Sequence, residues 1–208
     1  MDIFNCPTVV VRNCTFEHNG PVSVTKLQKY RGHAGGLSIA YYEEGTLPGP
    51  YALVSHCIFR NNSSDPLANL QSTSQLFKRF IFSGRGGGCA VNISPVYPLN
   101  ATVEDCYFED NFARSFGGGL YVGFDGNSNH TVVVNRVKLV RNQTPRAAGG
   151  LEIGFVQGAA LYSVNSIFVY NSEFIENHSE RGAGAYVFVP GKAANRHNHV
   201  VRNISCCG

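Results

Sequence analysis

The chain has 208 residues, of which 43% are hydrophobic, and a formal net charge of +3. This apolar content excludes a disordered chain, and so small and scattered a charge argues against nucleic-acid binding. No run of about 18 apolar residues occurs, so no membrane-spanning helix is predicted. The first residues lack the basic and apolar regions of a signal peptide, and we therefore expect this chain to be a piece of a longer protein.

One short pattern occurs five times along the chain. Each copy has phenylalanine or leucine, followed three positions later by asparagine and preceded five positions earlier by valine. The pairs are Phe16 and Asn19, Phe59 and Asn62, Phe108 and Asn111, Leu139 and Asn142, and Phe174 and Asn177. The valines are Val11, Val54, Val103, Val134 and Val169. A sixth, weaker copy closes the chain at residues 201–206.

A glycine-rich block follows each of the five copies. The blocks are residues 35–39, 87–91, 118–122, 149–153 and 183–187. The valine, phenylalanine and glycine-rich runs all alternate apolar with polar residues, which is the period of a β-strand. Successive asparagines lie 43, 49, 31 and 35 residues apart. The unit therefore has about 31 residues, with inserted loops at 20–34 and 63–85 in the first two copies.

These repeats predict an all-β fold, a right-handed parallel β-helix of about six three-strand coils. We expect it to form one domain over residues 1–208 and to be a segment of a longer solenoid. Equivalent side chains would stack about 4.8 Å apart. We expect the asparagines to adopt left-handed backbone where the chain leaves the strand, with their amides bonded to one another. The Gly-Gly pairs are expected at a corner where a side chain would clash.

Nine Asn-x-Ser/Thr sequences suggest a secreted glycoprotein. Three of them, at Asn62, Asn142 and Asn177, belong to the asparagine column, and we expect those to be buried and unmodified. The six predicted glycosylation sites are Asn13, Asn61, Asn92, Asn100, Asn129 and Asn203. Seven cysteines also fit an oxidising compartment. The predicted location is therefore extracellular, either secreted or at the cell surface.

Three cysteines, Cys14, Cys57 and Cys106, fall at one inward position of the unit. Two interpretations stay open, buried thiols and one disulfide between adjacent coils. No metal site is predicted, because the chain has no Cys-x-x-Cys pair and no partnered histidine. No cofactor is predicted either, since the glycine run at 84–88 lacks the Gly-Lys-Ser/Thr ending of a phosphate loop.

Acid–base chemistry on one face of such a fold needs clustered carboxylates, with calcium or a basic residue. The best candidate group for such chemistry is Glu109, Asp110 and Arg141. The alternative is that these opposite charges only alternate along a solvated face. We favour this alternative, because no predicted column stacks two carboxylates on adjacent coils.

The inserted loops 20–34 and 63–85 are predicted to lie side by side at one corner. The second holds an apolar and basic run in which Lys78, Arg79 and Phe80 are candidate binding residues. The alternative is that this run covers the side or the end of the solenoid.

The Phe-x-x-Asn and Gly-Gly-Leu motifs resemble the repeats of the polymorphic outer membrane proteins of chlamydiae, over roughly residues 9–206, with Leu139 departing from the first motif. The resemblance implies a parallel β-helix of the pectin-lyase-like type, displayed at a cell surface and used in adhesion. It carries over no catalytic residue. We therefore expect a non-catalytic scaffold that binds a cell-surface protein or glycan. The alternative is a carbohydrate-active enzyme.

Overall fold

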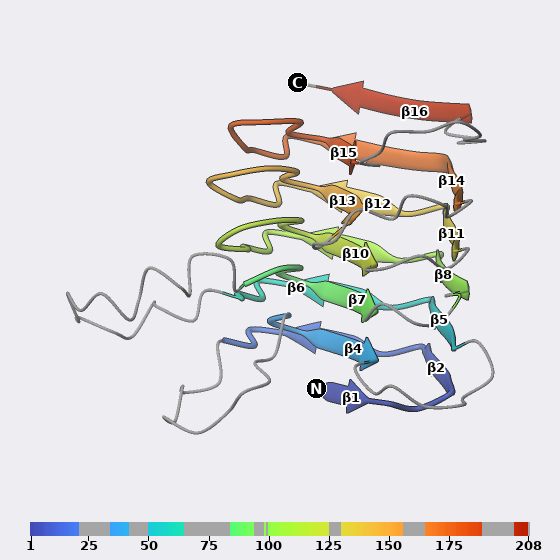
Figure 1. The fold of residues 1–208 in the computed structure, drawn as a ribbon. Coiled ribbons are helices and arrows are strands. Elements are labelled where there is room, and N and C mark those ends of the chain that lie inside the picture. The colour runs from blue at the N-terminus through green and yellow to red at the C-terminus, as the bar shows by residue number, and fades with distance from the viewer. Residues whose placement is uncertain are drawn as a thin grey trace, which may run out of the picture.

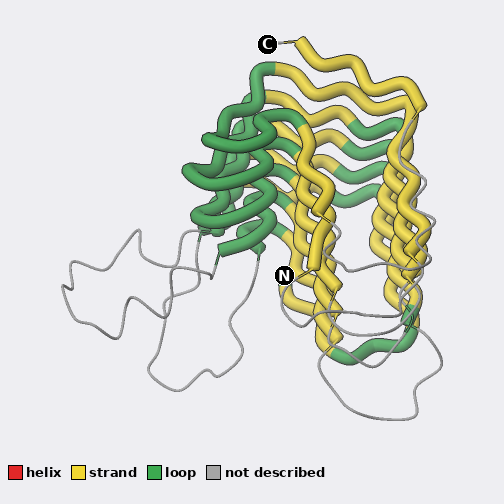
Figure 2. The backbone as a smooth tube through the Cα atoms, turned by 45° about the horizontal axis from the view of Figure 1, so that its top comes forward, coloured by secondary structure: helices red, strands yellow, loops and turns green. Residues whose placement is uncertain are grey.

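The computed structural model describes residues 1–20, 34–41, 50–64, 84–93, 98, 100–124, 130–155, 165–188 and 202–207. These residues form an all-β structure in which every pair of neighbouring strands is parallel (Figure 1). Each strand pairs with the equivalent strand of the next unit, so that successive units stack along one direction (Figure 2). No described segment forms a helix that is long and apolar enough to cross a membrane.

The first sheet has six strands, five of which directly follow the Gly-Gly or Ala-Gly pairs. In order across the sheet they are β1 (Asp2–Phe4), β4 (Leu37–Tyr41), β7 (Cys89–Ile93), β10 (Leu120–Phe124), β13 (Leu151–Phe155) and β15 (Ala185–Phe188). The blocks are in register, since Leu120 pairs with both Cys89 and Leu151.

The second sheet has ten strands and contains the valine and phenylalanine runs. The valine strands are β2 (Thr8–Arg12), β5 (Tyr51–Ser55), β8 (Asn100–Glu104) and β11 (His130–Asn135). The phenylalanine strands are β3 (Thr15–Glu17), β6 (Ile58–Arg60), β9 (Tyr107–Glu109) and β12 (Lys138–Val140). Strand β14 (Asn165–Ile175) joins the two series, because its first half pairs with β11 and its second half with β12. Strand β16 (Arg202–Cys207) pairs with β14 and places Cys206 beside Phe174.

The core lies between the inward faces of these strands. The rings of Phe16 and Phe59 stack with centroids 4.9 Å apart, and those of Phe59 and Phe108 with centroids 4.7 Å apart. Leu139 and Phe174 continue the same row and are fully buried. The ring spacing follows from the spacing of the strands, which is about 4.8 Å in any such ladder. No single unit could bury these side chains alone.

The two bends that flank the phenylalanine strand of each unit use a single residue with positive φ. The bend before the phenylalanine strand lies at Asn13, His56, Asp105, Arg136 and Asn171, with φ between 51° and 54°. The bend after it lies at His18, Asn61, Asp110, Arg141 and Glu176, with φ between 49° and 54°. The expectation that the asparagine column itself is left-handed was therefore wrong. The residue before each asparagine makes the turn, and the asparagine is left to form hydrogen bonds.

The asparagine amides form a continuous ladder. The Nδ2 atom of Asn62 donates to Oδ1 of Asn111 at 3.0 Å, and Nδ2 of Asn111 donates to Oδ1 of Asn142 at 2.8 Å. The same Nδ2 of Asn111 donates to the carbonyl oxygen of Phe59 at 2.9 Å, and its Oδ1 accepts the backbone N–H of Asn62 at 3.1 Å. Each amide in the middle of the stack is thus fully satisfied although it is buried. Asn19 and Asn177 extend the ladder at its two ends.

The glycine pairs stand where neighbouring units approach most closely. A Cβ atom on Gly118 would lie 2.6 Å from the backbone N and O of Gln143 and would also clash with the carbonyl oxygen of Gly149. By contrast, a Cβ atom on Gly20 would meet nothing within 4 Å. The pairs therefore allow the corner to pack against the next unit, backbone against backbone.

Asn111→Ala should lower the free energy of unfolding by about 3 kcal/mol, because it removes the acceptor of the backbone N–H and of one side-chain N–H of Asn62, and the side-chain donor to the carbonyl oxygen of Phe59, in a buried place. Urea unfolding followed by circular dichroism measures this loss. Asn111→Asp is the matched variant: its carboxylate accepts from Asn62 but cannot donate, so it should not restore stability. A loss below about 1 kcal/mol for Asn111→Ala would contradict the role of the ladder.

Candidate functional site

The structure brings together the three residues that the sequence suggested for an enzyme. The guanidinium group of Arg141 donates from Nε to Asp110 Oδ1 at 2.8 Å and from Nη2 to Asp110 Oδ2 at 2.9 Å. Its Nη2 also donates to Glu109 Oε1 at 2.6 Å. The other oxygen of Glu109 lies 3.0 Å from Nε of Arg60, an ion pair in which the N–H does not point at the oxygen well enough for a hydrogen bond. All four carboxylate oxygens therefore face an arginine.

The same alternation of charge continues along this face. Arg60 also lies 3.5 Å from Glu17, and Arg136 donates twice to Asp105, at 2.6 and 2.7 Å. The hydrogen bonds from Arg136 hold the pKa of Asp105 below its usual value. These side chains are partly exposed, so each pair contributes at most about 1 kcal/mol. The group has the geometry of an ion-pair lattice, and it leaves neither Glu109 nor Asp110 poised as a free acid or base.

The other residues suggested by the sequence are scattered. Lys78, Arg79 and Phe80 lie outside the described residues, as do Asn129 and nearly all of the two inserted loops. Asn203 is in β16, where no side chain is described. Three of the predicted glycosylation sites, Asn13, Asn61 and Asn100, are exposed. Asn92 is buried in β7, which does not favour its modification in the folded chain.

A cluster of buried polar groups lies on the outer face of the six-stranded sheet. Tyr121 and Glu152 are paired neighbours on β10 and β13, and their side chains point away from the core. The side chain of Arg85, from the corner that precedes β7, lies over the ring of Tyr121. Its guanidinium carbon is 5.2 Å from the ring centroid of Tyr121 and 5.8 Å from that of Phe116. We call Arg85, Phe116, Tyr121 and Glu152 the outer cluster.

Charge in the outer cluster is not balanced. Arg85 and Glu152 are each only 7% exposed. Burial raises the pKa of Glu152 to about 8, although the positive charge of Arg85 acts in the opposite direction. Among the described residues, neither Arg85 Nε nor Glu152 Oε2 has a hydrogen-bond partner. With a pKa of about 8 the carboxyl group is mostly protonated at neutral pH, and the guanidinium group of Arg85 lies against the faces of the two aromatic rings.

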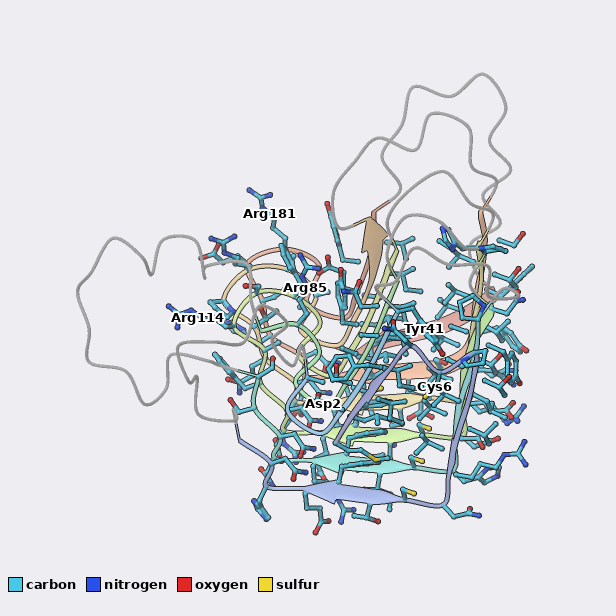
Figure 3. The ribbon with its side chains drawn as sticks, turned by 60° about the horizontal axis from the view of Figure 1, so that its bottom comes forward. Asp2, Cys6, Tyr41, Arg85, Arg114 and Arg181 are labelled. Carbon is cyan, nitrogen blue, oxygen red and sulfur yellow. The ribbon has the colours of Figure 1, made fainter. Side chains whose placement is uncertain are left out.

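Three more arginines stand at the same corner of the following units. Arg114, Arg146 and Arg181 lie, like Arg85, between the asparagine and the glycine-rich strand of their unit. The corners are in register, because Arg85 pairs with Phe116, Phe116 with Ala147, and Ala147 with Arg181. Figure 3 shows Arg85, Arg114 and Arg181 on one side of the stack. These four residues are the arginine corner, and the presence of at least one arginine in each corner segment was the signal in the sequence that could have revealed it.

The comparisons with known proteins add no relative: no family model, no curated protein and no solved structure matches this chain.

Glu152→Gln should change the pH dependence of stability. Because the pKa of Glu152 rises from 4.5 to about 8 on folding, its contribution is fully present below pH 4.5 and is lost as the pH rises toward 8. The side chain of the variant stays neutral at every pH. Near pH 8.5 its free energy of unfolding should therefore be higher than that of the unchanged protein by at least about 1.4 kcal/mol, the free energy of one pKa unit. The two proteins should be nearly equal in stability at about pH 4 and below. Urea unfolding at both pH values tests this, and an equal difference at both would contradict it.

Proposed function

We propose that the chain forms a right-handed parallel β-helix that acts as a non-catalytic scaffold outside the cell and binds an anionic ligand, a carboxylated or sulfated glycan, at its arginine corner. The observation that carries this proposal is the buried, incompletely paired guanidinium group of Arg85, at one end of a row of arginines.

Two observations support the β-helix assignment. The parallel strands form three columns, and the strands that pair in each column are one repeat unit apart in the sequence. Connections between parallel strands are right-handed in about 98% of known cases, which favours that hand. The likeness of the repeats to those of chlamydial surface proteins points the same way. The exposed positions of Asn13, Asn61 and Asn100 agree with a secreted or surface location.

The ligand class follows from the chemistry of the corner. Guanidinium groups bind carboxylates and sulfates through paired hydrogen bonds, and they do so most strongly where water is excluded. Successive coils are about 4.8 Å apart, so a chain-like anion lying along the stack would meet a new corner at each step. The partly exposed ring of Phe116 offers an apolar surface to a sugar ring beside these charges.

One observation favours the alternative, a carbohydrate-active enzyme. A buried carboxyl group that stays protonated at neutral pH has the property required of a general acid, and Glu152 is such a group. Hydrolysis or elimination would also need a base or a nucleophile near it. Cleavage of a bound glycan therefore distinguishes the enzyme from the scaffold.

Binding should be measured by calorimetry with a sulfated and a uronic-acid polysaccharide, using neutral dextran as the reference. Arg181→Glu should lower the affinity about tenfold, the effect of losing one charged hydrogen bond of roughly 1.5 kcal/mol. Arg12→Glu is the matched control, since Arg12 is exposed on β2, another face, and its reversal changes the net charge equally. An equal loss in both variants would indicate attraction to net charge alone and contradict the proposed site.

The same polysaccharides should be incubated with the chain, with and without calcium, and assayed for reducing or unsaturated ends. The scaffold function predicts no product. Product that disappears in Glu152→Gln would establish the enzyme instead, and product that disappears only in Asp110→Ala/Arg141→Ala would place catalysis in the ion-pair lattice.

A further inference from the structure

Three thiols stand above one another at the bend between the valine and phenylalanine strands. Cys14, Cys57 and Cys106 each directly follow the left-handed residue of that bend. Backbone hydrogen bonds hold them in register: the carbonyl oxygen of Cys14 accepts from Ile58 at 2.9 Å, and that of Cys57 accepts from Tyr107 at 2.9 Å. All three are free thiols in the structure.

The three sulfur atoms have the same orientation. Each Sγ donates to the carbonyl oxygen two residues earlier in its own unit, at 3.1, 3.2 and 3.1 Å in chain order. The Sγ atoms of Cys57 and Cys106 also contact the unit below, at Val11 O (3.7 Å) and Val54 O (3.6 Å). Hydrogen bonding with the Cys106 thiol lowers the pKa of Cys57.

The stacking limits which thiols can be joined. Adjacent units place equivalent Cα atoms about 4.8 Å apart, inside the range of about 4.4 to 6.8 Å found for disulfides. Cys14 and Cys106 are two units apart, roughly twice that spacing, and therefore outside the range. Cys57 is the only one of the three that can reach both others.

The column of thiols also ends where the long insertions end. The chain between Cys14 and Cys57 contains the 20–34 loop, and that between Cys57 and Cys106 contains the 63–85 loop. The next two units have short connections, and Val137 and Ser172 take the position of the cysteine. A covalent link is most useful where the connecting chain is longest, because there it removes the most conformational entropy from the unfolded state.

We propose that in an oxidising compartment this column forms one disulfide, in which Cys57 is always one partner and either Cys14 or Cys106 is the other. This bond links two adjacent units among the first three, which are the units connected by the long loops.

The reaction needs a small disulfide such as oxidised glutathione. The thiolate of Cys14, the least buried of the three, attacks one of its sulfurs, and a glutathione thiolate leaves. The thiolate of Cys57 then attacks Cys14 Sγ and displaces the second glutathione, so the protein loses two electrons and two protons. The thiolate of Cys106 can next attack Cys57 Sγ and release the thiolate of Cys14. This exchange moves the bond by one unit without further oxidation.

The full chain should be refolded in a glutathione redox buffer, its free thiols alkylated in urea, and its linked peptides identified by mass spectrometry. The unchanged chain should give linkages of Cys57 with Cys14, with Cys106, or with both in different molecules. Cys106→Ala should give only the Cys14 linkage and Cys14→Ala only the Cys106 linkage. Cys57→Ala should leave both outer thiols free for alkylation.

Cys89→Ala is the matched control, since Cys89 is a fully buried thiol in the other sheet, and it should leave the pattern unchanged. Circular dichroism confirms that each variant is folded. Three alkylated thiols in the folded, oxidised chain would overturn the proposal. So would a direct linkage of Cys14 with Cys106, or pairing of the column mainly with cysteines outside it.

Discussion

The in-register hydrogen bonding of successive units is the constraint on which the rest of the structure depends. It places each side chain about 4.8 Å from its equivalent in the next unit, so a residue must be compatible with a copy of itself or with a complementary partner. Phenylalanine satisfies this by stacking, and asparagine satisfies it because one amide both donates and accepts. A charge does not, and the column of Glu17, Arg60 and Glu109 therefore alternates in sign.

The in-register constraint is weakest at one corner of each unit, the connection from the asparagine to the glycine-rich strand. The two single-residue bends are the same in every unit, but the connection from the asparagine to the glycine-rich strand varies in length and in sequence. That corner holds the long insertions, the arginine corner and one side of the outer cluster. A rigid stack with one variable edge is a suitable base for binding residues, since insertions there do not disturb the ladder.

The core could be predicted from the sequence because stacking makes the same residue types recur at the same position. The partners of Phe108, namely Phe59 and Leu139, follow directly from that recurrence. The left-handed residue could not be found in this way, because five different residue types occupy it, from His18 to Glu176. Asparagine tolerates left-handed backbone, so the left-handed residue was predicted at the asparagine, whereas it lies one position earlier.

The outer cluster was missed for a related reason. Arg85 and Glu152 come from different units. Phe116 and Ala147 separate Arg85 from Arg181 in its column, and tyrosines flank Glu152 on both sides in its own, so no unbroken column indicates either residue. They come close because a long arginine side chain extends across the sheet. The spacing of the repeats predicts only which residues are in register, so it does not predict this contact. By contrast, the charges of Glu109, Asp110 and Arg141 were correctly placed near one another, because they occupy adjacent positions of neighbouring units.

If interchangeable units are the basis of this fold, removing one whole unit should leave all the columns aligned. The most direct test is deletion of residues 112–142, which joins Asn111 to Gln143 at equivalent points of two units. Circular dichroism and urea unfolding should show the same β-structure and a single cooperative transition, at somewhat lower stability. Deletion of only residues 112–127, about half a unit, should abolish folding. A half-unit deletion that folds as well as the whole-unit deletion would contradict the account.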